Sequence, residues 1–202
     1  MTRIQDIESL EALYEAKPSA AAMDKVAHHM TPLYRQWIMS SRFCVLGTVG
    51  PEGTDTSPRG DDGPVVAEID THTLAMPDWR GNNRLDSLRN IVRDGRVSLM
   101  FMVPGSVNVV RVNGAAHLDT DPDLRARFAR NERSPRTVIV IEIAEIYSQC
   151  ARAILRSRLW TGADESADLP SVGDILTEMT EGAFDGAEYD LRWSDRAQGT
   201  MW

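Results

Sequence analysis

Two short polar segments carry side chains suited to binding an anion. The first is Thr56-Ser57-Pro58-Arg59-Gly60, in which a hydroxyl and a guanidinium stand two residues apart. Alternate residues of a strand point to the same face, so Ser57 and Arg59 can converge on one phosphate or carboxylate if this segment is extended. A solvated loop without a ligand is the alternative interpretation of the same residues.

The second segment, residues 76–85, is expected to join a strand to the first turn of a helix. Arg80 and Arg84 lie within it, and Asn82 or Asn83 is expected to cap the helix. The start of a helix offers unpaired N–H groups and the positive end of the helix dipole, which favours a phosphate. Both arginines can reach such a phosphate, although a capped helix with ordinary surface arginines fits the pattern as well.

Two further groups of arginines are candidates for a site. Arg111 stands between two valines in an expected strand, so its side chain must either face solvent or pair inside a site. Arg152 and Arg156 share one face if their segment is helical, and Arg158 and Trp160 follow closely. A surface face with the tryptophan packed beneath it is the alternative there.

Several other chemistries lack the residues they need. The four histidines have no metal-ligand spacing, so no metal site is expected. No lysine lies beyond Lys25, which disfavours Schiff-base chemistry in the core. Cys44 and Cys150 are far apart, and Cys44 lies in an apolar segment where an inert buried thiol is expected. No Ser–His–Asp set can be assigned, so no catalytic side chain is named.

The charge is distributed unevenly along the 202 residues. Residues 161–202 contain ten acidic residues and two arginines, whereas residues 1–160 contain 20 residues of each sign, so the whole net charge of −8 belongs to the tail. A neutral body with an acidic tail has no bulk attraction for nucleic acid. No run of about 18 apolar residues and no apolar leader is present, so a cytoplasmic protein without a membrane partner is expected.

The hydrophobic pattern predicts a mainly β protein with flanking helices. About six strands are expected near residues 43–49, 65–70, 73–76, 97–103, 107–118 and 138–146, with helices near 84–93 and 122–130. We expect a helical segment at residues 1–41, a barrel at 42–160 and an acidic arm at 161–202 with a helical pattern at 172–179, all in one domain. Strands joined by short hairpins indicate an antiparallel barrel, and the lack of βαβ alternation disfavours a Rossmann fold.

Residues from about 33 to 160 resemble the pyridoxamine 5′-phosphate oxidase-like, FMN-binding split-barrel superfamily, and best a bacterial subgroup of FMN-dependent enzymes. The strings that carry this resemblance are FCVLGTVGPEG, TSPRGDDG, TLAMPDWRGNNRLDSLRNIVRDGRVSLMFMVPG, VVRVNGAAHL and CARAILRSRLW. The third string is similar to the strand–loop–helix–strand block that holds the flavin phosphate in this superfamily. The resemblance implies a homodimer of six-stranded antiparallel split β-barrels, with FMN in two clefts at the subunit interface.

The resemblance also implies roles for residues of the first two segments. Ser57 and Arg59 stand where family members contact the phosphate and the edge of the flavin ring. Backbone groups at Met76 and Pro77 stand where the isoalloxazine ring is lined. Two basic residues usually grip the phosphate at the positions of residues 83 and 84. Because the first of them is asparagine here, Arg80 is expected to share the phosphate with Asn83 and Arg84.

Two positions depart from the vitamin-pathway oxidase. Val109 stands where that enzyme offers a glutamine to the flavin from the partner subunit, so Arg111 is the expected polar contact on this strand. Its substrate-binding Arg-x-His motif is missing, and Arg156 and Arg158 stand roughly there, with Trp160 close by, as candidate substrate residues. This departure disfavours oxidation of pyridoxine phosphate itself.

The expected function is therefore that of an FMN-dependent oxidoreductase that transfers two electrons between the flavin and a small organic substrate. Four alternatives remain: a flavin-binding module without enzymatic activity, a split barrel that uses a deazaflavin, one that handles haem, and an interaction domain whose arginines only face solvent.

Overall fold

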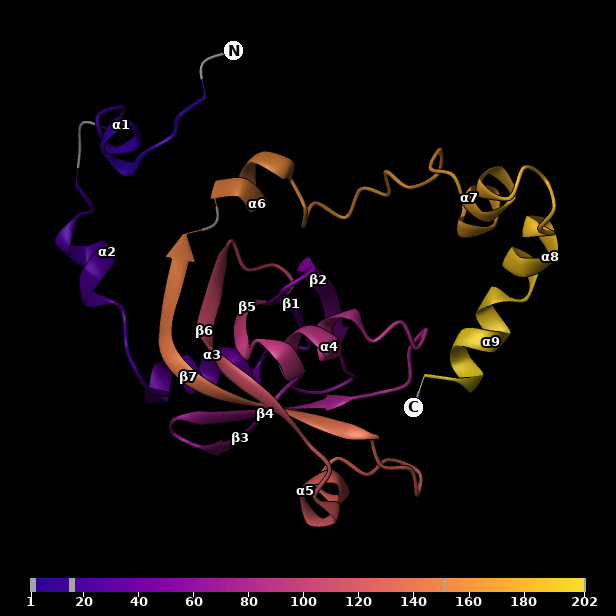
Figure 1. Cartoon of the computed structure of the whole chain (residues 1–202), viewed down its shortest axis with the longest axis horizontal. Helices are drawn as coiled ribbons and strands as arrows, with labels where there is room; N and C mark the ends of the chain where they lie inside the picture. The colour runs from indigo at the N-terminus through magenta and orange to yellow at the C-terminus, as the bar shows by residue number, and fades with distance from the viewer. Residues whose placement is uncertain (1–2, 15–16, 151, 202) are drawn as a thin grey trace.

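The computed structural model describes residues 3–14, 17–150 and 152–201. Its centre is an antiparallel sheet of seven strands in the order β2-β1-β5-β6-β7-β4-β3 (Figure 1). The strands are β1 Phe43–Gly50, β2 Gly53–Gly60, β3 Ala67–Asp70, β4 Thr73–Asp78, β5 Arg96–Met102, β6 Asn108–Asp119 and β7 Thr137–Cys150. This architecture confirms the predicted mainly β class with flanking helices.

The sheet has one strand more than the six expected, and the additional strand is β2. It lies at an edge of the sheet, and of the described strands it pairs with β1 alone, from Gly53 opposite Gly50 to Gly60 opposite Phe43. Its side chains are exposed or half-buried, so the strand lacks the apolar alternation by which the others are recognised. The segment with Ser57 is therefore an extended strand and not a solvated loop.

The core lies between the inward faces of the strands. Leu46, Leu99, Phe101 and Val112 are fully buried in one hydrophobic cluster, and inward positions alternate with more exposed ones along β1 and β5. The pairing of β6 with β7 shifts register at Gly114, where a side chain would meet the Glu142 carbonyl oxygen at 2.0 Å. Glycine therefore permits the irregularity in these two longest strands.

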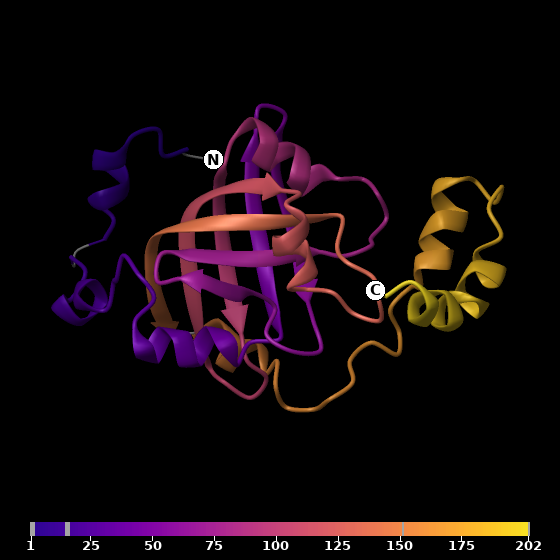
Figure 2. The same cartoon turned by 90° about the horizontal axis from the view of Figure 1, so that it is seen from below.

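The helices are α1 Ile7–Glu11, α2 Ala20–Asp24, α3 Pro32–Met39, α4 Asp86–Arg93, α5 Pro122–Ala126, α6 Arg152–Ser157, α7 Val172–Met179, α8 Gly186–Leu191 and α9 Trp193–Gly199. Figures 1 and 2 both place α1 and α2 on one side of the sheet and α7–α9 on the opposite side. No helix in the described part of the chain has the length and apolarity needed to cross a bilayer.

In the described part of residues 1–41, the expected helical segment contains the short helices α1, α2 and α3, of which α3 packs on the core. Its Ile38 is fully buried, and Trp37 lies against the same hydrophobic cluster. The periodic apolar residues near the N-terminus are not covered by any other part of the chain that the structure describes. The exposed members of that stripe are Ile4, Ile7, Leu10, Leu13 and Tyr14.

Helix α4 is held close to β1 by two features. Asn90 on the helix donates a hydrogen bond from Nδ2 to Thr48 Oγ1 at 3.2 Å. A side chain at Gly50 would meet Asn90 Oδ1 at 2.2 Å, so only glycine allows the helix this approach. The contact fixes where α4 begins relative to β2.

Candidate functional site

A cavity of about 1850 Å³ lies between the ends of β2 and β4, the start of α4 and the segment before β7. It brings together seven of the eight residues predicted to bind a cofactor, although they come from separate parts of the sequence. These seven are Ser57, Arg59, Met76, Pro77, Arg80, Asn83 and Arg84. Arg59 and Arg84, which lie 25 positions apart in the sequence, therefore line one cavity.

A continuous chain of polar contacts crosses the wall of this cavity. Ser87 donates to Asp55 Oδ2 at 2.5 Å, and its hydroxyl lies 3.0 Å from that of Ser57. Arg59 donates from Nε to Ser57 Oγ at 3.2 Å and from NH1 to Asp78 Oδ1 at 2.7 Å. We call these five residues the polar chain. Because the Arg59 side chain is only 19% exposed and is held from two sides, its guanidinium has a fixed position.

The first turn of α4 opens onto the cavity without a side-chain cap. The prediction that Asn82 or Asn83 caps the helix is wrong. Asn82 Oδ1 accepts a hydrogen bond from the N–H of Arg84 at 3.1 Å and does not reach the helix. Asn83 and Leu85 both have left-handed backbone angles, with φ of 60° and 63°, so the helix begins only at Asp86. The uncapped first turn keeps the anion-binding property expected of it.

Arg84 lies on the rim of the cavity. Its side chain is 75% exposed and donates to Asp86 Oδ2 at 2.7 Å. The hydrogen bond to Asp86 raises the pKa of Arg84. Its position at the solvent boundary makes it a weaker anchor for an anion than Arg59.

The floor of the cavity includes an open stretch of backbone. β3 pairs with β4 only as far as Ala75, whereas β7 pairs with β4 along its whole length. Among the described residues, the β4 edge at Met76 and Pro77 therefore has no strand partner on the β3 side. An edge of this kind presents backbone polar groups to a ligand. Both side chains are buried, which leaves the backbone as the part that can contact a bound molecule.

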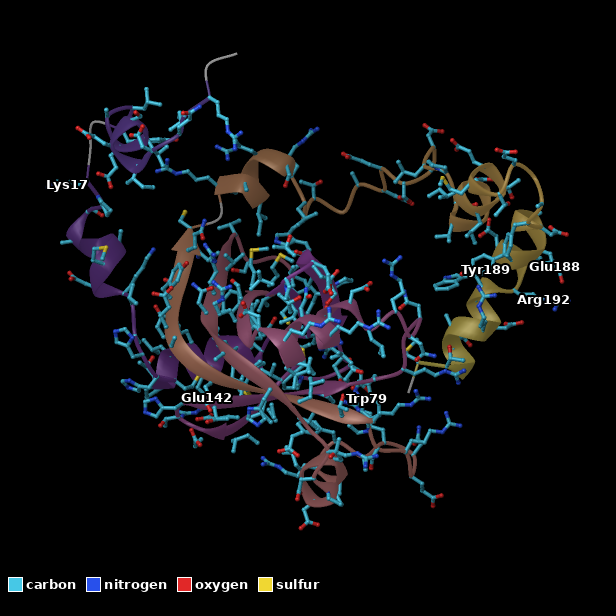
Figure 3. All side chains as sticks on the ribbon, in the orientation of Figure 1. Lys17, Trp79, Glu142, Glu188, Tyr189 and Arg192 are labelled. Atoms are coloured by element: carbon cyan, nitrogen blue, oxygen red, sulfur yellow. The ribbon has the colours of Figure 1, made fainter. Side chains whose placement is uncertain are left out.

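Trp79 follows β4 and lies on the side of the barrel nearest the C-terminal helices (Figure 3). Its Nε1 donates to Asp61 Oδ2 at 3.3 Å, and Arg130 donates to Asp61 Oδ1 at 2.5 Å and also to Asp62. Burial raises the pKa of Asp61, whereas the hydrogen bond from Arg130 lowers the pKa of the exposed Asp62. These contacts tie the β2–β3 connection to the segment before β7.

Four predicted residues lie outside the cavity in their own chain. Arg111 is on β6 with its guanidinium 5.3 Å from the centre of the Tyr147 ring, and it donates to Gln149 at 3.4 Å. Arg156 and Arg158 are exposed. Trp160 packs against a small apolar cluster and donates a hydrogen bond to the Ser106 carbonyl at 2.8 Å. This packing agrees with the alternative interpretation of the segment, a surface face with the tryptophan beneath it. Their cofactor and substrate roles stay predictions.

The cavity also contains residues that sequence reasoning missed. Asp55, Asp78 and Ser87 complete the polar chain, and residues 133–137 also line the cavity. Gly199 and Met201 of the acidic arm line the same cavity, so the end of the arm returns to its own barrel. The sequence carried a signal only for Asp78, which directly follows the predicted Met76–Pro77 pair.

Charge in the lining favours anions. The residues that line the cavity include more arginines than aspartates. The arginines are Arg59, Arg80, Arg84, Arg89, Arg93, Arg133 and Arg136, and the aspartates are Asp55, Asp61, Asp62, Asp78 and Asp86. Among the residues the structure describes, no group of three or more histidine, cysteine, aspartate or glutamate side chains could hold a metal ion.

Cys44 lies next to Arg59 in the β1–β2 pairing and is fully buried. Burial raises the pKa of its thiol to about 12, and the Arg59 guanidinium only partly opposes this effect. The thiol is therefore protonated and unreactive at neutral pH. We expect a thiol reagent to label no more than one cysteine, the exposed Cys150, in the native protein and both after unfolding. Labelling of Cys44 in the native protein would show that β1 is not packed as described.

Comparison with solved structures places the fold among known proteins. HupZ of Group A Streptococcus superposes with a TM-score of 0.50 at 16% sequence identity, over 60% of this chain and 95% of its own. A candidate pyridoxamine 5′-phosphate oxidase from Lactobacillus delbrueckii gives a TM-score of 0.48 at 20% identity, over 60% and 95% of the two chains. No curated protein sequence matches the chain.

The comparison with family models covers the barrel itself. The model described as pyridoxamine 5′-phosphate oxidase matches residues 30–150, which run from the buried Met30 before α3 to the end of β7. The match includes β1–β7, α4 and every residue of the polar chain. This protein belongs to the pyridoxamine 5′-phosphate oxidase family.

Proposed function

We propose that this protein is an FMN-dependent oxidoreductase that transfers two electrons between the flavin and a small organic substrate. The observation that carries the proposal is the convergence of Ser57, Arg59, Met76 and Arg84 on one cavity. These residues come from β2, β4 and the segment before α4. Membership of the pyridoxamine 5′-phosphate oxidase family supports the same cofactor.

The residues present fit the phosphate of FMN. Arg59 has donors beyond the two used by Ser57 and Asp78, since a guanidinium carries five N–H groups. The uncapped start of α4 adds backbone N–H groups and the positive end of a dipole. The Ser57 and Ser87 hydroxyls lie 3.0 Å apart and can reorient toward an oxyanion. Arg84 and Arg80 would close the site from the solvent side.

The rest of the cavity fits an aromatic ring system. The open backbone edge at Met76 and Pro77 would hydrogen-bond the polar edge of the ring, and Val65 and Leu118 supply apolar surface beside it. When bound, FMN supplies two-electron transfer chemistry. The protein's part is to fix the ring against the β4 edge and to hold positive charge in the surrounding wall, where it stabilises negative charge on a bound molecule.

Homodimerisation is part of this proposal. Arg111 projects near Tyr147 outside the cavity of its own chain, so it would contact the cofactor only from a second copy of the chain. We expect sedimentation of the FMN-loaded protein to give about 45 kDa, twice the 22.5 kDa of one chain. A flavin-loaded monomer would show that Arg111 does not contact the cofactor.

The absorbance of the purified protein, together with mass spectrometry of the released small molecule, tests the cofactor. We expect the absorbance spectrum to show flavin bands and the released small molecule to have the mass of FMN. We also expect a nicotinamide donor to reduce the bound flavin anaerobically and an acceptor to reoxidise it. A flavin that is bound but never turned over would indicate a binding module without enzymatic activity. A Soret band would indicate haem, and colourless protein that ignores added FMN would favour a deazaflavin or no flavin-type cofactor.

Replacing Arg84 with alanine is expected to weaken FMN binding by about 0.5–1.5 kcal/mol, because one exposed charge-assisted contact is lost. Calorimetric titration with FMN measures the change, and riboflavin, which lacks the phosphate, is the matched ligand control. Its affinity should stay within about twofold. Unchanged FMN binding by the variant would remove Arg84 from the phosphate site.

A further inference from the structure

The end of the acidic arm, residues 161–202, reaches the mouth of the cavity. Gly199 is the last residue of α9, Met201 follows it closely, and both line the cavity. Met201 is nevertheless 52% exposed, so the cavity is open around it. None of the three hydrophobic clusters in the described part of the chain includes a residue beyond Trp160. The described arm therefore reaches the barrel with its tip and shares no hydrophobic core with it.

Helices α7, α8 and α9 are built as one unit, which we call the arm unit. A Cβ atom at Gly173 on α7 would meet the Gly186 carbonyl oxygen on α8 at 2.2 Å, so only glycine allows the two helices to cross this closely. Asp190 on α8 accepts a hydrogen bond from the Gly173 N–H at 3.0 Å. The ring of Tyr189, labelled in Figure 3, lies 6.4 Å from the ring of Trp193 on α9. These contacts make the three helices move together.

A long connection without helix or strand joins the arm unit to the barrel (Figures 1 and 2). It runs from the end of α6 at Ser157 to the start of α7 at Val172. The hydrogen bonds of residues 161–170 are local, as in the bond from the Leu169 N–H to the Ser166 carbonyl at 3.0 Å. Because these bonds do not fix the connection to the sheet, the arm unit can turn about it as a rigid body.

Charge attracts the arm unit to the mouth of the cavity. The whole net charge of −8 belongs to residues 161–202. Three arginines that line the cavity are exposed to solvent, and these are Arg80, Arg89 and Arg136. Opposite charges attract most strongly within a Debye length, which is about 8 Å at physiological ionic strength. A unit whose tip already lies at the mouth is close enough for this attraction to act.

Apolar surface on the arm unit matches apolar surface at the mouth. Met179 on α7, Leu191 on α8 and Trp193 on α9 are all more than half exposed. Two residues that line the cavity near α4, Leu85 and Val92, are exposed as well. Bringing the two surfaces together removes apolar area from water, which favours the closed arrangement.

We propose that the arm unit is a cover that closes over the cavity of its own chain, with Met201 entering the cavity, and that the cover limits the size of the molecules that reach the flavin. The inference rests on the proposed function for the identity of the cofactor. The arm closes its own cavity because its own tip lines that cavity. Closure of such a segment excludes water and bulky molecules from a site.

The first test compares two new thiols in the protein without flavin. Met201→Cys places one at the tip of the arm and Met23→Cys places one on α2, where the methionine is 59% exposed. Both variants carry Cys150→Ser, since Cys150 is exposed and Cys44 is buried. A neutral thiol reagent should label position 201 at least about tenfold more slowly than position 23, with each rate divided by that of the same variant when unfolded. Equal rates, or protection that appears only at high protein concentration, would overturn a cover formed within one chain.

Gly173→Ala tests whether the arm unit provides this protection. The added Cβ would force α7 away from α8, so labelling at position 201 should rise to within about threefold of that at position 23. Gly63→Ala is the matched control, because its Cβ would meet no atom within 4 Å and the residue lies outside the cavity lining. Slow labelling that persists in Gly173→Ala would overturn the role of the helices.

The FMN-saturated protein tests selection by size. After anaerobic reduction, the flavin is reoxidised by benzoquinone or by the same quinone joined to a polyethylene glycol chain, and each quinone takes up two electrons and two protons. Relative to reduced FMN in solution, we expect the linked quinone to react at least about tenfold more slowly than the free quinone in the wild type, and within about threefold of it in Gly173→Ala. Equal relative rates in the wild type would overturn the limit on size.

Failure of the proposed function gives a different result. A wild-type protein that takes up no FMN overturns the proposed function alone, because the labelling comparison needs no flavin. Slow labelling at position 201 that Gly173→Ala abolishes would then still support the cover, and equal rates at positions 201 and 23 would overturn it.

Discussion

Replacing Arg59 with alanine is expected to weaken FMN binding by about 1.5–3 kcal/mol, or about 10- to 150-fold. Arg59 is the least exposed arginine of the proposed phosphate site, and its contacts to Ser57 and Asp78 fix its direction. The substitution also leaves the Asp78 carboxylate without this partner near the phosphate, which adds repulsion to the lost attraction. Calorimetric titration with FMN measures the effect, which should exceed that of the exposed Arg84.

The contribution of Asp78 can be separated by a double-mutant cycle. Asp78→Asn alone removes a negative charge and should not weaken FMN binding. Arg59→Ala combined with Asp78→Asn should bind FMN more tightly than Arg59→Ala alone, because the two residues interact directly. Riboflavin again serves as the ligand without a phosphate. Equal losses for FMN and riboflavin would mean that Arg59 supports the fold of the cavity and does not bind the phosphate.

Replacing Phe101 with alanine is expected to lower the free energy of unfolding by about 3–5 kcal/mol. Phe101 on β5 is fully buried and is among the largest such side chains, in the same hydrophobic cluster as Met76 and Leu46. Its removal would leave a cavity between strands that also carry the site. Urea unfolding at a fixed protein concentration measures the change, which keeps any contribution of association constant.

Phe43 provides the matched control for this core substitution. It is the same residue type on the neighbouring strand β1, and it is 37% exposed. Phe43→Ala should therefore cost much less than Phe101→Ala, because less apolar surface is returned to water. Similar losses at both positions would contradict the assignment of Phe101 to the core.

Strong local patterns made much of the fold predictable. The apolar alternation of β5 and β6 located both strands to within about two residues of their observed bounds, and the helical pattern at 172–179 is α7 itself. The sequence did not predict β2, because a strand at the edge of a sheet, with one face in a polar cavity, needs no apolar alternation. The apolar residues before residue 15 predicted a longer helix than α1, but no other described segment packs against their exposed face.

The site was predictable where its residues lie on one local segment. Residues 76–85 are adjacent in sequence, so their common position followed from one strand–loop–helix pattern. Ser87 and residues 133–137 join the site only through long-range packing of α4 and of β7 on β4, which no single-sequence pattern encodes. The start of α4 was misplaced because two left-handed residues, neither of them glycine, delay the helix.

A crystal structure of the FMN-saturated protein tests directly where the phosphate and the flavin ring bind. We expect a phosphate oxygen within about 3.2 Å of the Arg59 guanidinium, with the phosphate at the first turn of α4 and the ring along the β4 edge at Met76 and Pro77. An FMN phosphate bound away from Arg59 and from the start of α4 would contradict it.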